Sequence, residues 1–465
     1  MGSITNKPQY VAPSMIRHQF SNAMSCIYKA EVPLYSNLLN LVSDVNNSIL
    51  ERDLSLKQHL EESDQFSRLQ YERHGAIRLG TASEMATMAR FLSVMDMHPV
   101  GYYDLSLASL PVHATCFRTL DLDSLNKNPF RLFVSLLRPS LIPEALHSLV
   151  GGILSKRAIF SRRTLELIQI AEDQGGLTPD QVSEYISNGL ETFKWTRTST
   201  ATTIEYQMLK SSSPLLADIV AFPTAHINHL TPRTLDIEAV QAGMKSYGLP
   251  MKESIEGPPG GRNCLILLRQ TSFKALEDEV LFLGDGGDGV QGRHCARFGE
   301  VEQRGAALTP KGRKLYDDLV GEARAKGIGP EVTEAYAKIF ARFPDSWDAL
   351  RKENLAWLRY YIPESRPHGT PEPGADLDTL IAGGWVRYEP ITYEDFLPLS
   401  AAGIFQSNLG REKEGLRSYE PGDESGDHGR GELVNAIGLD INDEMVVYRD
   451  LQEKSIKECL YNFRP

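Results

Sequence analysis

The sequence predicts an α+β fold, on the evidence of three patterns along its 465 residues. Apolar residues recur three and four apart through most of residues 14–75 and again through 138–210, which is the spacing of amphipathic helices. Two other stretches, 98–120 and 217–306, are richer in β-branched and aromatic residues and are interrupted by glycine and proline, which is typical of strands. The predicted order is therefore helices, strands, helices, strands and helices.

Individual elements within this order carry start and stop signals. TASEMATMARFLSVM (81–95) opens with a threonine cap followed by an acidic residue, and 309–327 opens with Thr-Pro and ends with glycine, so both are predicted helices. HPVGYYDLS (98–106) and PVHATCFRTL (111–120) predict strands. Strand character resumes in ADIVAFPTAHINHL (217–230), which carries two histidines.

We expect residues 1–465 to form a single catalytic unit with four successive regions. These are the N-terminal helices and first strand region, a helical insert, a second strand region, and a C-terminal helical cap, at about 14–120, 121–215, 216–325 and 326–465. Within the cap, segment 411–432 is charged, glycine-rich and almost without apolar residues, which predicts a mobile surface loop.

Composition narrows the class of protein. The chain is 41% hydrophobic and has no apolar run of the roughly 18 residues that a membrane helix needs, so we expect a cytoplasmic protein that does not enter membranes. A formal net charge of −12 argues against nucleic acid as the main partner, although a local basic pocket can still hold a small anion. Five scattered cysteines without a CxxC pair indicate reduced thiols. No pattern predicts an oligomeric state.

Two strand-like stretches share one spacing. In RHGAIRLG, His74 is followed four residues later by Arg78, and in NHLTPRTL, His229 is followed four residues later by Arg233. A third group, Glu300, lies on another predicted strand in RFGEVEQRG. Two imidazoles and one carboxylate from separate strands can form a facial triad, which binds Fe(II) and leaves coordination positions free for a chelating acid and O2.

Long strings of this sequence resemble one family, the 2-oxoadipate dioxygenase/decarboxylases, also called hydroxyglutarate synthases. The resemblance covers nearly the whole chain and is carried by RHGAIRLG, GYYDLS, VAFPTAHINHLTPRTLDI, ILLRQTSFKAL, ARFGEVEQRGAALTPKGRKLYDDL and YEDFLPLSAAGIFQSNLG. It implies a vicinal-oxygen-chelate core, built from duplicated βαβββ-type halves. It also implies conversion of 2-oxoadipate and O2 to (R)-2-hydroxyglutarate and CO2, in lysine catabolism. His74, His229 and Glu300 are then the expected Fe(II) ligands and catalytic residues.

The resemblance also decides between neighbouring candidates. Residues two apart on a strand share a face, so His226 and His229 should point to opposite faces and only one should reach the metal. The family pattern places the ligand at His229, and we expect His226 to be a hydrogen-bonded structural residue or a partner of the ligands. The resemblance assigns the carboxylate ligand to Glu300, and we expect Glu302 and His294 at solvated or loop positions.

A 2-oxo dicarboxylate also needs cationic partners. The resemblance assigns substrate contacts to Arg78, beside His74 and His229, because a guanidinium can pair both oxygens of a carboxylate. Leu399 and Ser400 correspond to the family segment that lines the substrate pocket, and the position of Leu399 is more commonly valine. Arg269 and Gln270 are further pocket candidates, although half of a strand must face away from a site.

Two other readings of the same residues remain open. One is a divalent-metal hydrolase or lyase on this core, which would need no O2, and the other is a non-enzymatic module that binds a metal and an acid. The glycine-rich LGDGGDGVQGRHC (283–295) lacks the Lys-Ser/Thr of a phosphate loop, so it predicts a hairpin turn without chemistry.

Overall fold

The computed structural model describes residues 9–62, 65–284, 289–330, 332–369, 371–372, 374–397 and 424–463. These residues divide into two compact units. The larger unit takes the described residues within 1–252, 271–302 and 398–441, and the smaller unit those within 253–270, 303–397 and 442–465. The boundary passes through strands β7 (Leu268–Ser272) and β10 (Glu300–Arg304).

The larger unit contains a five-stranded mixed sheet in the order β2-β3-β4-β1-β6. Its strands are β1 (Arg73–Leu79), β2 (His98–Asp104), β3 (Val112–Arg118), β4 (Phe130–Leu137) and β6 (His229–Pro232). The first four strands and helix α5 (Ala82–Ser93) make one βαβββ half, in which β1 and β4 run parallel and the other pairs are antiparallel. A capping box between Thr81 and Glu84 starts α5, as its sequence predicts.

The second half repeats this pattern. It begins with β6 and α12 (Ile237–Gly243), continues through antiparallel bridges from residues 251–256 to β7, and ends at β10. A bridge from Arg233 to Glu302 runs parallel, like the pairing of β1 with β4. Because β1 also pairs antiparallel with β6, the first strands of the two halves are joined. The predicted α+β class with duplicated βαβββ halves is therefore confirmed.

The other helices of the larger unit come from the N-terminal, inserted and C-terminal segments of the chain. The larger unit contains α1 (Pro13–Glu31), α2 (Pro33–Arg52), α3 (Leu54–Glu62), α4 (Gln65–Tyr71), α6 (Leu122–Lys127), α7 (Glu144–Leu154), α8 (Arg162–Gln174), α9 (Pro179–Leu190), α10 (Thr203–Ser212), α11 (Pro214–Val220) and α18 (Glu424–Ile437). Short 3-10 turns lie at Ser106–Ala108, Pro139–Leu141, Glu191–Phe193 and Met244–Tyr247. None of the helices in the described part of the chain combines the length and apolar character that a membrane crossing requires.

A smaller three-stranded sheet in the larger unit has the order β5-β8-β9. Its strands are β5 (Thr198–Thr202), β8 (Leu276–Leu283) and β9 (Val290–Arg297). The antiparallel pairing of β8 with β9 confirms the predicted hairpin, although residues 285–288 of its turn lie outside the described residues.

The smaller unit consists of helices and a two-stranded antiparallel sheet. It contains α13 (Pro310–Ala325), α14 (Thr333–Phe340), α15 (Trp347–Lys352), β11 (Leu358–Tyr361), α16 (Leu377–Ala382), β12 (Arg387–Pro390) and α19 (Glu444–Tyr461). β11 and β12 are antiparallel, and α19 packs on β11, where the Ser455 hydroxyl accepts a hydrogen bond of 3.1 Å from Tyr360 N. Thr309 caps α13, which begins at Pro310 as predicted.

Two predictions about local structure were wrong, and a third was wrong in part. Residues 121–215 are not only a helical insert, because β4 lies at 130–137 between β3 and β1 with all eight residues buried. Because both faces of β4 are buried, its sequence shows no regular alternation of apolar and polar residues. In 217–230, the first residues belong to helix α11, which starts at Pro214, and the strand begins only at His229.

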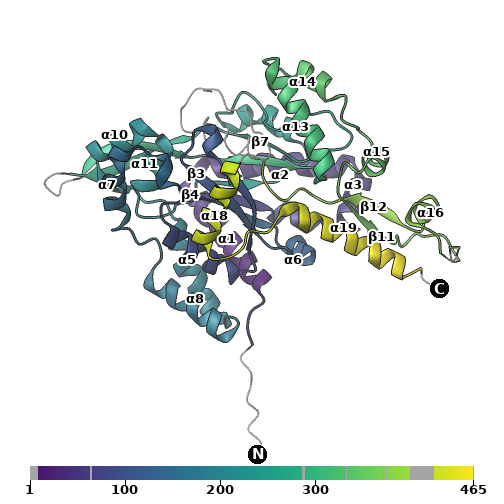
Figure 1. Ribbon diagram of the computed structural model, residues 1–465, viewed down its shortest axis with the longest axis horizontal. Helices are drawn as coiled ribbons and strands as arrows, with labels where there is room; N and C mark the ends of the chain where they lie inside the picture. Colours follow the sequence, from purple (N-terminus) through teal and green to yellow (C-terminus); the bar gives the residue numbers. More distant parts are fainter. Residues whose placement is uncertain are drawn as a thin grey trace, which may run out of the picture. The chain divides into compact units, whose positions relative to one another are not determined.

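The third prediction, that residues 411–432 form a mobile surface loop, was wrong in part. Residues 411–423 lie outside the described residues, but 424–432 are the first turns of α18, shown in yellow in Figure 1. This helix contacts α5, β2 and β3, and His113 lies 3.1 Å from the carbonyl oxygen of Gly429. Packing against the sheet therefore holds a glycine-rich sequence in a helix that its composition disfavours.

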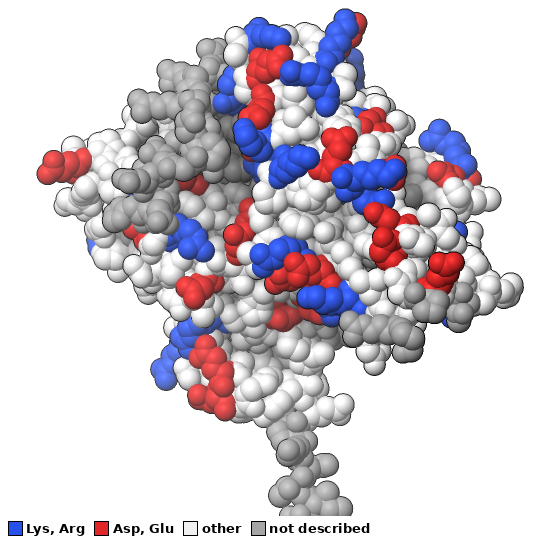
Figure 2. Space-filling view, turned by 45° about the vertical axis from the view of Figure 1, so that its right-hand side comes forward, with Lys and Arg blue, Asp and Glu red and all other residues white. Residues whose placement is uncertain are grey.

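Acidic and basic side chains are interspersed on the molecular face shown in Figure 2. Oppositely charged side chains also pair one turn apart on α13, such as Lys314 with Asp318 at 3.0 Å and Arg313 with Asp317 at 3.0 Å. This face therefore carries no continuous basic stripe of the kind that nucleic acid binding requires.

Candidate metal centre

Strands β1 and β6 bring two histidines to one face of the large sheet. Their antiparallel register pairs His74 with Thr231 and Ala76 with His229. Since side chains alternate along a strand, His74 and Arg78 share the face of Ala76, and His229 lies diagonally from both. His74 is 0% exposed and His229 is 5% exposed. The two predicted imidazole ligands are thus brought together in the interior.

A glycine makes this approach possible. A Cβ atom on Gly75 would lie 2.5 Å from Cδ1 of Ile227, in the segment that leads into β6. The backbone amide of Asn228 also donates a 3.0 Å hydrogen bond to the carbonyl of Ala76. A side chain at position 75 would therefore push this segment, and His229 with it, away from β1.

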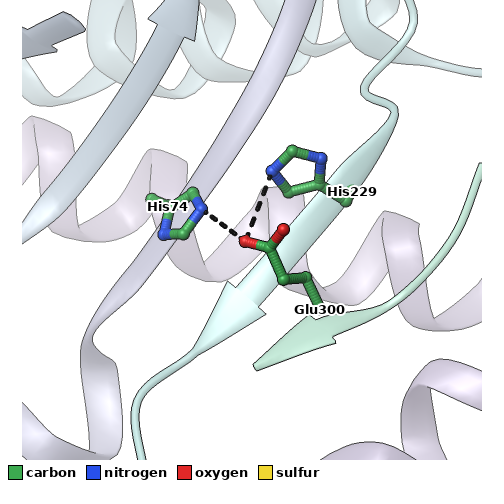
Figure 3. A group of neighbouring side chains, drawn as sticks. All are labelled: His74, His229 and Glu300. Atoms are coloured by element: carbon green, nitrogen blue, oxygen red, sulfur yellow. Dashed lines mark ion pairs between the residues drawn. The ribbon is translucent and has the colours of Figure 1, made fainter. Parts of the chain in front are cut away.

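Glu300 completes the group from the start of β10 (Figure 3). Its Oε1 lies 3.0 Å from Nε2 of His74, 4.0 Å from Nε2 of His229, and accepts a 3.0 Å hydrogen bond from the hydroxyl of Thr231. All three candidate ligand atoms lie within 4.8 Å of one another, and all three residues are buried. The structure thus brings together the three predicted ligands.

The protonation states of His229 and Glu300 favour a cation at this point. Burial lowers the pKa of His229 to about 4, which leaves its imidazole neutral at neutral pH. Burial alone would raise the pKa of Glu300, but His229 and His74 lower it overall, so the group is a carboxylate. For His74, burial lowers the pKa, but Glu302 and Glu300 outweigh this effect and raise it overall. Two imidazoles and a carboxylate at this spacing suit a divalent cation, whose neighbouring ligands lie roughly 3 Å apart.

Glu302 lies behind His74, and the expectation that it is solvated was wrong. It is 0% exposed, and its Oε2 lies 2.8 Å from Nδ1 of His74. A carboxylate on Nδ1 holds that proton there and directs Nε2 toward the ligand group. The strand alternation used for the histidines could have found this residue, because Glu300 and Glu302 are two apart and share a face of β10.

A chain of buried charges continues from Glu302. Arg131 on β4 joins Glu302 at 2.8 Å to Glu72 at 2.6 Å. Glu72 also pairs with Arg68 at 3.1 Å and Arg233 at 3.0 Å, and these arginines hold its pKa well below the usual range although burial alone would raise it. Charges buried this deeply are stable only when each is paired, so the chain fixes the orientation of Glu302 and, through it, of His74.

Arg78 and His226 belong to a second buried group. Nη1 of Arg78 pairs with Oδ2 of Asp218 on α11, and Oδ1 of Asp218 lies 3.1 Å from Nε2 of His226 and 2.8 Å from Nε2 of His294. His226 precedes β6 rather than lying on it, so strand alternation does not explain its separation from His229. His294 is 3% exposed, so the expectation of a solvated or loop position was wrong for it too.

The remaining pocket candidates are only partly described. Leu399 and Ser400 lie outside the described residues. Arg269 and Gln270 lie on β7 and are buried. Arg269 donates hydrogen bonds of 2.9 Å to the carbonyl of Pro258 and 3.1 Å to Oε1 of Gln303, so its guanidinium is engaged by the protein.

Comparisons with known proteins point to one family over most of the chain. Residues 20–408 match the family model of 2-oxoadipate dioxygenase/decarboxylase. The chain is 48% identical over 447 residues to the 2-oxoadipate dioxygenase/decarboxylase of Escherichia coli K12, covering 96% of this chain and 97% of the relative. It is 46% identical over 462 residues to the Pseudomonas putida protein of the same name, covering 97% of each.

A solved structure is similar over the same length. The crystal structure of the hydroxyglutarate synthase from Pseudomonas putida in complex with 2-oxoadipate matches with a TM-score of 0.87 and 45% sequence identity. The match covers 98% of this chain and 99% of that chain. The similarity therefore extends over both compact units.

Proposed function

The chain belongs to the 2-oxoadipate dioxygenase/decarboxylase family, and from that membership we propose that it converts 2-oxoadipate and O2 to (R)-2-hydroxyglutarate and CO2. The observation that carries the proposal is the convergence of His74, His229 and Glu300 in the interior of the larger unit. The relative bound to 2-oxoadipate supports the choice of substrate.

We propose Fe(II) as the metal at His74, His229 and Glu300. Two imidazoles and one carboxylate are the donor set of non-haem iron oxygenases, and three protein ligands leave positions for other groups. When bound, Fe(II) supplies a site for the 2-oxo acid and O2 to meet. The residues fit, because burial keeps His229 neutral and the hydrogen bond with His74 favours the ionised form of Glu300.

The protein's own groups have three tasks in this reaction. Glu302 orients His74 through Nδ1, and the buried chain from Arg131 to Glu72 holds Glu302 in place. The buried position of all three ligands excludes bulk water from the reacting carbons. Arg78 binds a carboxylate of the substrate, and Leu399 and Ser400 remain predicted pocket residues.

Gas exchange tests the reaction directly. Anaerobically iron-loaded protein mixed with 2-oxoadipate and O2 should consume one O2 for each CO2 released. Both atoms of labelled O2 should appear in 2-hydroxyglutarate, because the CO2 carries away the two oxygens of the carboxylate that the substrate loses. A divalent-metal hydrolase or lyase would turn over without O2, and a binding module would consume neither reactant. Either result would overturn the proposal.

A further inference from the structure

Asp218 lies at the centre of a buried group that the proposed reaction leaves without a role. It is 3% exposed and lies on α11, and its partners come from three other segments. Arg78 extends from β1, His226 precedes β6, and His294 lies on β9. Four segments that are far apart in sequence therefore converge on one carboxylate.

The hydrogen bonds of this group define the orientation of that carboxylate. Arg78 and His226 lower the pKa of Asp218 well below its usual range, although burial alone would raise it, so it is ionised and only accepts hydrogen bonds. Nε2 of His226 and Nε2 of His294 both approach Oδ1, at 3.1 and 2.8 Å, and must therefore donate to it. Oδ2 faces Nη1 of Arg78.

Two aromatic residues, Tyr206 and Trp195, contact the imidazoles of His226 and His294. On the other side of the His294 ring, Nδ1 lies 2.9 Å from the hydroxyl of Tyr206, within hydrogen-bond distance. The indole of Trp195 packs edge-on against His226 at 4.7 Å and stacks on His294 at 5.9 Å between ring centroids. The carboxylate of Asp218 is therefore a fixed hydrogen-bond acceptor, and the position of the Arg78 guanidinium follows from it.

Arg78 connects this group to the metal ligands. It lies on the same face of β1 as His74 and diagonally from His229 across the β1–β6 pair. In the proposed function Arg78 also binds a substrate carboxylate, and the five N–H donors of a guanidinium allow it to contact more than one carboxylate.

We propose that Asp218, held by His226 and His294, is a positioning residue that sets the direction of Arg78 toward the substrate. The inference rests on the proposed function, in which Arg78 binds a carboxylate of 2-oxoadipate. Although two histidines and a carboxylate could also hold a metal, the carboxylate is already neutralised by a guanidinium, which would repel a second cation. The group is therefore a clamp for Arg78.

The variant Asp218→Asn tests the clamp, because it keeps the shape and removes the charge. In the iron-loaded enzyme, KM for 2-oxoadipate and its Kd from anaerobic calorimetry should both rise about tenfold, as for the loss of one charged hydrogen bond. Iron content should stay unchanged, and kcat should change less than about threefold, because the metal ligands are untouched. The double variant Arg78→Ala/Asp218→Asn should match Arg78→Ala alone, since Asp218 acts through Arg78.

Asp96→Asn is the matched control. Asp96 lies in the same unit, 3.9 Å from the buried Arg17, and has a φ of 56°, which asparagine tolerates. Its KM should equal that of the wild type. If Asp218→Asn does not fold, Tyr206→Phe removes only the hydroxyl that holds His294 and should raise KM about twofold, with no increase in the Arg78→Ala background.

Each other outcome has a definite meaning. Loss of iron from Asp218→Asn would make the group a metal site, and an unchanged or lower KM would mean that Asp218 does not direct Arg78 to the substrate. A further loss in the double variant would separate the two residues. Wild-type protein that binds 2-oxoadipate without consuming O2 overturns the proposed reaction while Kd still tests the clamp, and protein that does not bind it overturns both.

Discussion

Two buried groups in the larger unit contain the same kinds of side chain. His74, His229 and Glu300 form one group, and Asp218, His226 and His294 form the other. The carboxylate of the first faces two imidazoles and the Thr231 hydroxyl, whereas the carboxylate of the second also pairs with a guanidinium. We infer from this comparison that ligand types alone do not define a metal site, because the cation that neutralises the carboxylate can be a protein side chain.

The groups also differ in how the fold places them. All three members of the first group lie on strands β1, β6 and β10, whose register sets the spacing of the side chains. The second group combines a helix residue, a residue from an irregular segment and a strand residue. Strand pairing therefore makes the first group rigid from the backbone, whereas the second depends on its hydrogen bonds.

The largest expected effect separates the two groups by iron content. Replacing His74, His229 or Glu300 with alanine should reduce bound iron below detection and lower turnover by roughly a thousandfold or more, because each change removes a proposed ligand. Metal analysis of protein loaded anaerobically with Fe(II) measures retention, and O2 uptake measures turnover.

His226→Ala is the matched control for this experiment. It removes an equally buried imidazole from the other group and should leave the iron content unchanged. If His226→Ala lost its iron while His229→Ala kept it, the assignment of the two groups would be reversed.

The next effect concerns the cation of the second group. Arg78→Ala should raise KM for 2-oxoadipate roughly ten- to a hundredfold, because a charged hydrogen bond to a buried carboxylate contributes about 1.5–3 kcal/mol. KM for 2-oxohexanoate, which lacks the distal carboxylate, should change little. Steady-state kinetics with both acids measures the difference, and an equal loss for the two would place Arg78 at the 2-oxo end.

A smaller effect, on iron affinity, is expected for Glu302, which contacts His74 of the first group. Glu302→Gln keeps a hydrogen-bond acceptor for Nδ1 of His74 but removes the charge, so iron affinity should fall about tenfold. Competition with a chelator gives the affinity, and thermal unfolding of the metal-free protein monitors the fold. An unchanged affinity would show that the charge of Glu302 does not tune the ligand.

The smallest effect is a pH dependence in the second group. Burial lowers the pKa of His226 below 6.5, although Asp218 raises it, while His294 and Arg78 act in the same direction as burial. The unfolded chain then binds this proton more readily than the folded protein, so the stability is fully present above about pH 6.5 and is lost as the pH falls toward the folded pKa.

This loss can be at most about 1.4 kcal/mol per pH unit for one proton. His226→Gln should therefore flatten the dependence of the unfolding free energy on pH below 6.5, measured by denaturant unfolding of metal-free protein. An unchanged slope would mean that His226 does not titrate differently in the folded protein.

The sequence by itself determined the fold class and the three ligand candidates. Periodicity separated helices from strands, and strong local signals such as the Thr81 cap and the Thr309-Pro310 start gave correct helix ends. The resemblance of long strings to one family identified His74, His229 and Glu300 before any geometry was known. Such features are local or are carried by neighbouring residues, so they can be read along the chain.

Only the tertiary structure decided which partners these residues have. Both faces of strand β4 are buried, so its sequence shows no regular alternation, and no local pattern reveals that buried Arg131 supports Glu302. Residues 217–220 have strand-like composition but lie in a buried helix, and that helix brings Asp218 to Arg78 and His294. These contacts join residues 59 to 171 positions apart in the chain, and no local pattern encodes a pairing whose free energy comes from burying both groups together.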